Sequence, residues 1–235
     1  MTLHPTSRAS RSYTVIVTVL GLLSSHVSCT NTATGAGSGV GAGGNNTAEG
    51  SFSWIGGGSH STAYADYSSV GGGLSNRALM DAAVVAGGEA NAANGTWGSV
   101  GGGRYNRIVS GQSSIVSGGA YNTIDASFAS VGGGERNVAA AAYSRVGGGD
   151  SSTAHGEICV VAGGSENVNY GKGGVISGGK ENTVNAIAGL IAGGYYNSVD
   201  GSWGTVSGGR QNQLHGEYGS LGGGYGNHNS GYSAT

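Results

Sequence analysis

The sequence predicts an all-β, single-domain parallel β-solenoid, a β-roll of about thirteen coils with 15 residues each. Two observations carry this prediction: an apolar residue precedes a Gly-Gly pair at a nearly constant spacing, and the 235 residues include 52 glycines but only 1 proline. Gly-Gly at this frequency would destabilise helices, and the glycines follow no Gly-X-Y triplet, which excludes collagen. Successive steps are 15 residues, except one of 16, along Val40, Ile55, Val70, Val85, Val100, Val116, Val131, Val146, Val161, Ile176, Ile191, Val206 and Leu221.

We number each coil from its recurring apolar residue, which is position 1. Positions 3 and 4 are Gly-Gly in every coil but the first, where Ala42 stands at position 3. Position 7 is Asn except at Ser61 and Ser152, and position 9 is mostly Ala, Val, Ile or Leu. Because side chains in a strand alternate between two faces, positions 7, 9 and 11, and positions 14, 1 and 3, are expected to face a shared interior. Gly-Gly and the next two residues form one corner, and positions 12 and 13 form the other.

Three features of the coil lead to further structural expectations. Stacked coils form parallel ladders about 4.8 Å apart, so the Asn column at position 7 is expected to form an amide ladder along the rod. Aromatic residues at position 13 are expected to stack at the second corner. The single 16-residue step predicts a bulge or a widened corner near Ser110 and Gly111.

The first residues predict a secretory signal, which divides the chain into a signal peptide at 1–29, a Gly/Thr-rich linker at 30–39 and the solenoid at 40–235. A basic n-region precedes an apolar run that is too short to span a bilayer, and small residues follow it. Cys29 is either removed with the signal or lipidated, and the sequence leaves both alternatives open. The protein is expected to be secreted or at the cell surface, with no transmembrane segment.

The residue pattern predicts no enzyme, no cofactor and no metal site. The acidic residues are scattered, with no pair suited to acid–base catalysis. His155 and His215 occupy equivalent positions four coils apart, which is about 20 Å by ladder spacing and too far to share a metal. The net charge of −2 gives no electrostatic footprint for nucleic acid. Cys159 is expected to be a small buried thiol.

A spaced set of small and apolar residues recurs within the coils: Gly44, Thr47 or Asn46, Ala48, Gly50, Ser53 and Ile55 in an early coil, and Gly194, Asn197, Val199, Gly201, Gly204 and Val206 in a later one. This set resembles the head repeat of the trimeric autotransporter adhesins, the YadA-like head, in which Gly, a small polar residue, Ala, a second Gly, Ser and an apolar residue recur at fixed intervals. The resemblance covers residues 40–235 and implies a left-handed parallel β-roll, a homo-oligomer with a trimer favoured, and surface adhesion. The chain shows neither the heptad stalk nor the membrane strands of that family, so membrane anchoring is not expected.

Positions 5 and 6, directly after Gly-Gly, gather much of the charge and many of the tyrosines. Tyr and Arg are favoured at protein contacts, so this corner is either a solvated edge or a recognition stripe. Two sequons make Asn45 and Asn94 candidate N-glycosylation sites in a eukaryotic host. The candidate binding stripe consists of Arg104, Tyr105, Tyr121, Arg136, Tyr195, Tyr196, Arg210 and Tyr225.

These observations favour an adhesion or binding module that contacts a cell-surface or matrix ligand along the side of the rod. The alternative is a structural coat or matrix protein that assembles with copies of itself. Ice binding is a third, minor reading, because Thr recurs at position 8, but the Thr row is interrupted, for example by Arg77 and Arg107.

Overall fold

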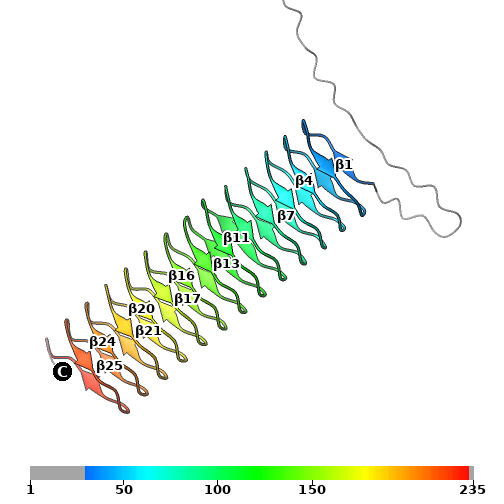
Figure 1. The fold of residues 1–235 in the computed structure, drawn as a ribbon. Helices are drawn as coiled ribbons and strands as arrows, with labels where there is room; N and C mark the ends of the chain where they lie inside the picture. Colours follow the sequence, from blue (N-terminus) through cyan, green and yellow to red (C-terminus); the bar gives the residue numbers. More distant parts are fainter. Residues whose placement is uncertain (1–29, 233–235) are drawn as a thin grey trace, which may run out of the picture.

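The computed structural model describes residues 30–232 and shows a parallel β-solenoid with coils 15 residues apart. Figure 1 shows the coils stacked side by side into a straight rod, with the chain advancing from one end to the other. Each coil contributes one short strand to each of two sheets, and every strand pair in both sheets is parallel. Within the described residues no helix is long and apolar enough to cross a membrane.

The two sheets run the length of the rod on opposite sides of a thin interior. The first sheet has 14 strands, formed mainly by positions 8 and 9, and the second has 13, formed by positions 15 and 1. The first sheet contains β1 (Thr32–Ala33), β3 (Thr47–Ala48), β5 (Thr62–Ala63), β7 (Arg77–Ala78), β9 (Ala92–Ala93), β11 (Arg107–Ser110), β13 (Thr123–Asp125), β15 (Val138–Ala139), β17 (Thr153–Ala154), β19 (Val168–Asn169), β21 (Thr183–Val184), β23 (Ser198–Val199), β25 (Gln213–Leu214) and β27 (His228–Asn229). The second contains β2 (Gly39–Val40), β4 (Trp54–Ile55), β6 (Ser69–Val70), β8 (Val84–Val85), β10 (Ser99–Val100), β12 (Ile115–Val116), β14 (Ser130–Val131), β16 (Arg145–Val146), β18 (Val160–Val161), β20 (Val175–Ile176), β22 (Leu190–Ile191), β24 (Thr205–Val206) and β26 (Ser220–Leu221).

The core consists of columns of small and aliphatic side chains that repeat from coil to coil. Position 1, for example Val70, and position 9, for example Ala63, have no exposed surface, as predicted from the alternation of strand side chains. Position 14 fills the remaining space with small side chains such as Ser68. The expected inward direction of position 11 also holds in most of the described coils, where this residue is buried or half-buried, and Met80 at 41% exposure is an exception. It holds less well at position 3, where Gly72 is half-buried at the start of the corner.

The Asn column at position 7 connects the coils through backbone groups. Asn91 Nδ2 donates to the carbonyl of Gly87 at 2.9 Å in its own coil and to that of Gly103 at 2.8 Å in the next coil. Its Oδ1 accepts the backbone N–H of Asn106 at 2.9 Å. Direct amide-to-amide bonds, as in Asn212 Nδ2 to Asn197 Oδ1 at 3.1 Å, occur only in some of the described coils. The column is therefore a ladder, as predicted, but mostly a side-chain-to-backbone one.

The glycine at position 4 is required by both backbone geometry and space. Gly88 has φ +94°, and a Cβ added there would lie 2.0 Å from the carbonyl oxygen of Gly103 in the next coil. Its neighbour Gly87 at position 3 has only the Gly72 carbonyl oxygen within 4 Å, at 3.8 Å. This difference explains why position 4 is Gly in all thirteen coils whereas Ala42 is accepted at position 3.

Two segment expectations can be placed on the structure. The stretch 30–39, expected as a linker, contains strand β1, which pairs with β3, so coil geometry begins within it. The expected irregularity in the 16-residue coil is confirmed as a β-bulge, because the register between β11 and β13 shifts between Ile108 and Ser110 and leaves Val109 as the extra residue. The signal-peptide prediction for 1–29 lies outside the described residues.

Candidate functional site

The corner after Gly-Gly, called here the Gly-Gly corner, carries a first cluster of predicted stripe residues in neighbouring coils. The Tyr105 and Tyr121 rings stack with centroids 5.1 Å apart and parallel planes. The Arg104 guanidinium lies over the Tyr121 ring, 5.6 Å from its centroid. Both rings are nearly half exposed, at 46% and 44%. Stacked rings beside a cation form a surface that is rigid, apolar on its faces and positively charged at one edge.

A second cluster lies on the same corner towards the C-terminal end of the rod. The Arg210 guanidinium lies 5.2 Å from the centroid of Tyr195 and 5.7 Å from that of Tyr225, so one cation bridges rings in the coils before and after it. Tyr196 packs edge-on against Tyr195 at 5.6 Å. Tyr225 is 69% exposed and Tyr196 54%. This arrangement holds the guanidinium in place, since both of its neighbours are rings.

Ion pairs occupy the stretch of the corner between the two clusters. Arg136 is paired with Glu135 at 3.0 Å and with Asp150 at 3.4 Å. Lys180 lies 3.3 Å from Glu181, and the neighbouring carboxylates raise its pKa. Seven of the eight residues of the predicted stripe therefore form the two clusters, and Arg136 lies apart from both. The sequence could not separate these groups, because spacing places residues on a corner but does not show which partners neutralise them.

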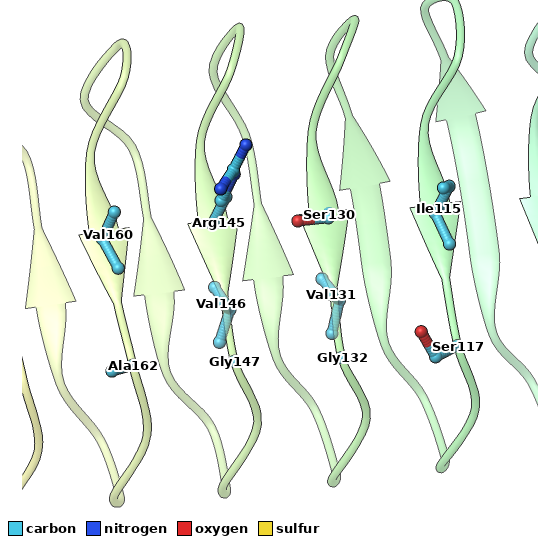
Figure 2. Close-up of a pocket in the computed structure, with 10 residues that line it drawn as sticks. All are labelled: Ile115, Ser117, Ser130, Val131, Gly132, Arg145, Val146, Gly147, Val160 and Ala162. Atoms are coloured by element: carbon cyan, nitrogen blue, oxygen red, sulfur yellow. The ribbon is translucent and has the colours of Figure 1, made fainter.

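The outer face of the second sheet is flat and poor in charge. Positions 15 and 2 form this face, and among its described residues only Arg145 is charged. Side chains such as Ile115, which is 49% exposed, border a shallow groove of about 440 Å³ that crosses four coils. Figure 2 shows its lining residues in rows along the coils: Ile115, Ser130, Arg145 and Val160 in one row, and Ser117, Gly132, Gly147 and Ala162 in another.

The opposite corner, formed by positions 12 and 13 and called here the aromatic corner, carries exposed aromatic rings that are not part of the predicted binding stripe. The expected stacking at position 13 is confirmed for Phe52 with Tyr67 at 5.4 Å and for Phe128 with Tyr143 at 5.0 Å. Residues at this position have positive φ, for example +57° at Phe52. Spacing alone predicted the stack, whereas the exposure of these rings depends on the corner geometry.

Within residues 30–232 the one cysteine thiol is buried, and several histidines stack on other rings. The Cys159 thiol is fully buried in the position 14 column, and burial raises its pKa to about 11. His155 stacks on Tyr170 at 5.0 Å and His215 on His228 at 4.6 Å, both on the outer side of the first sheet. Among residues 30–232 no group of three or more His, Cys, Asp or Glu side chains is placed to hold a metal ion.

The two sequon residues make hydrogen bonds to the next coil. Asn45 Nδ2 lies 3.2 Å from His60 Nε2, and Asn94 Nδ2 donates to the Val109 carbonyl at 3.0 Å.

The chain was compared with protein-family models and with curated proteins. No protein-family model matches it. A search of curated proteins likewise finds no match.

Proposed function

We propose that the chain is a secreted or surface-exposed binding rod of YadA-like head type, which attaches to a cell-surface or matrix ligand through its Gly-Gly corner. The observation that supports this function is the pair of exposed Arg–Tyr clusters on one corner of a straight rod. Tyr121 and Tyr196 are five coil steps apart, about 24 Å by ladder spacing. Two clusters held at a fixed distance can contact one large ligand together, which raises the affinity above that of either cluster alone.

The test measures binding of the purified chain to immobilised cells and to extracellular-matrix preparations. Changing Arg104 and Tyr121 to Ala, or Arg210 and Tyr225 to Ala, is expected to weaken binding about tenfold or more, because aromatic and Arg contacts dominate interfaces. The control changes Arg77 to Ala, an exposed cation on the outer face of the first sheet. The proposal fails if the folded chain binds none of these surfaces, or if both cluster variants bind as tightly as the unchanged chain.

A second candidate, assembly of the rods into a coat or matrix, is supported by the face of the second sheet. Two such faces placed together would be in contact over about 58 Å, which is the length of twelve ladder steps between thirteen coils. The three residues from position 15 to position 2 extend about 10 Å across the face, which gives roughly 580 Å² per copy and is near the lower end of the range of specific interfaces. The single charge at Arg145 leaves little repulsion to oppose the contact. The YadA-like resemblance favours a closed trimer as the oligomer.

Light scattering of the purified chain distinguishes these oligomeric states. A concentration-independent trimer supports the YadA-like type, and growing filaments support the coat. Changing Ile115 to Glu places a second charge on the face, between Ser99 and Ser130 and away from Arg145, and is expected to dissociate either assembly, since an unpaired charge in an apolar interface is costly. A monomer at all concentrations would rule out the second candidate.

A further inference from the structure

The aromatic corner holds ring side chains that neither the turn nor the core requires. These residues are 44% to 64% exposed, so they add little to the core. Their backbone is in the left-handed region, which costs a non-glycine residue about 1 kcal/mol, and Gly173 stands at the equivalent position of another coil. Ala82 and Ser113 have the same positive φ at this position, so the turn does not require a ring, and an exposed apolar column that neither turn nor core requires is typical of an interaction surface. It contains Phe52, Tyr67, Trp97, Phe128, Tyr143, Trp203 and Tyr218.

The column has two gaps in the N-terminal half of the rod, each of one coil that has no ring at position 13. Rings in adjacent coils stack, as in Phe52 with Tyr67 at 5.4 Å and an interplanar angle of 11°. Tyr67, Trp97 and Phe128 are instead two coils apart, with Ala82 and Ser113 at the positions between them. We call these gaps the Ala82 slot and the Ser113 slot. Each slot has an aromatic residue in the coil before it and another in the coil after it, and these two coils are about 10 Å apart by ladder spacing.

A row of polar side chains borders the slots at position 12. Asp66, Asp81 and Gln112 are exposed there. Asp66 Oδ1 accepts the backbone N–H of Ser51 at 2.7 Å, which leaves its second oxygen available. Among residues 30–232 Asp81 forms no ion pair. In the first six coils the segments from position 10 to position 15 contain no Lys or Arg, so this part of the corner disfavours an anionic ligand.

We propose that the Ala82 and Ser113 slots bind pyranose rings of neutral glycans. A pyranose ring has an apolar C–H face and a rim of hydroxyl groups, and the slots offer aromatic rings above and below with carboxylate and amide acceptors beside them. A purely aromatic guest would match the rings but would leave Asp81 desolvated without a hydrogen-bond donor. Two slots two coils apart bind two sugar residues about 10 Å apart, which suits a surface dense in glycan ends. This site is separate from the Gly-Gly corner.

The experiment measures binding of cellohexaose, chitohexaose and mannohexaose to the full chain by isothermal titration, with sialyllactose as the anionic probe. Changing Trp97 to Ala removes the wall that both slots share and is expected to weaken binding about tenfold, as for loss of one stacked ring. The matched control is Trp203→Ala, because Trp203 occupies position 13 but has Ala188 and Gly173 in the two preceding coils and so borders no slot. It is expected to change the affinity less than twofold.

A second pair of variants separates loss of the site from loss of the fold. Ala82→Phe and Ser113→Phe complete the aromatic column, so the chain is expected to stay folded while sugar binding disappears. The proposal is overturned if no neutral oligosaccharide binds at millimolar concentration, if sialyllactose binds more tightly than the neutral sugars, or if the filled variants still bind. It is also overturned if filling the slots changes only self-association, since the guests would then be rings of a second copy. None of these outcomes decides binding at the Gly-Gly corner, which the Arg104 and Arg210 variants test.

Discussion

The Asn at position 7 joins the Gly-Gly turns of adjacent coils through hydrogen bonds to their backbone groups. In Asn91 one amide bonds two glycine carbonyls and one backbone N–H, and its own N–H bonds Asn76 Oδ1 at 3.0 Å. Ser61 keeps only part of this set: its Oγ accepts the Asn76 N–H at 3.3 Å. The two Ser substitutions show that the acceptor is the function that every coil retains.

Changing Asn91 to Ala is therefore expected to destabilise the chain by about 2–3 kcal/mol, because buried backbone groups lose their partners. Asn91→Ser should cost less, since it preserves the acceptor for Asn106. Urea unfolding followed by circular dichroism measures both. Equal midpoints for the Ala and Ser variants would contradict the role given to the acceptor.

The adjacent glycines at positions 3 and 4 offer a matched pair of substitutions. Gly88→Ala should be destabilising by more than about 3 kcal/mol, because the new Cβ meets the Gly103 carbonyl oxygen at 2.0 Å and the φ of +94° is unfavourable. Gly87→Ala, one residue earlier, should change stability by less than about 1 kcal/mol. Thermal unfolding of the two variants provides the comparison, and similar losses would show that the crowding at position 4 relaxes.

The buried Cys159 thiol predicts a specific pH dependence. Its pKa rises from 9.0 to about 11 on folding because burial disfavours the thiolate. The effect on stability is absent below about pH 9, where both states hold the proton, and stability is lost from there to about pH 11 as the unfolded thiol ionises first. Cys159→Ser should remove this component of the pH profile. Alkylation by iodoacetamide at pH 8 should be slow in the folded chain and fast in urea, and rapid modification of the folded protein would contradict the burial.

At the scale of the strand and its corner, spacing was sufficient to predict which positions face the core. Positions 1, 7 and 9 are buried as expected, because two-residue strands such as β6 and β7 keep the strict alternation of an extended chain. The corners were less predictable, because exposed positions such as Met80 follow local turn geometry. The residues of the candidate stripe share one corner, as their positions predicted, but their division into two clusters follows from the ion pairs of Arg136 and Lys180, which residue spacing does not contain.

The bulge in β11 gives a prediction at the same scale. Deleting Val109 should restore a 15-residue coil and change stability by no more than about 1 kcal/mol, because the extra residue lies outside the paired register. The control deletes Thr123 in β13, which should move Ile124 outward and Asp125 inward and so prevent folding. Circular dichroism and thermal melting distinguish the two. If the Val109 deletion unfolds the chain, the bulge is structurally required.

The whole molecule behaves as a stack in which each coil contacts only its neighbours. Both sheets add one strand per coil in the same register along the rod, so no coil depends on a distant one. In such repeat structures stability is close to a sum of coil and interface contributions.

Removing residues 147–161 joins position 1 of one coil to position 2 of the next. The shortened chain should fold and lose about 4.8 Å of length, measurable by small-angle X-ray scattering. Removing 147–160, one residue fewer, should disrupt every later column by a register error. A folded product from the second deletion would show that the register is less strict than the columns indicate.

The uniform spacing of the position 4 glycines affects how the number of repeats can change during evolution. Gain or loss of one repeat in the gene keeps both the reading frame and the backbone fold, because any coil can be the neighbour of any other. The outward columns are then free to diverge, since Val and Asn on the inner side carry the architecture. Such a chain can lengthen, shorten and acquire new surface chemistry without passing through an unfolded ancestor.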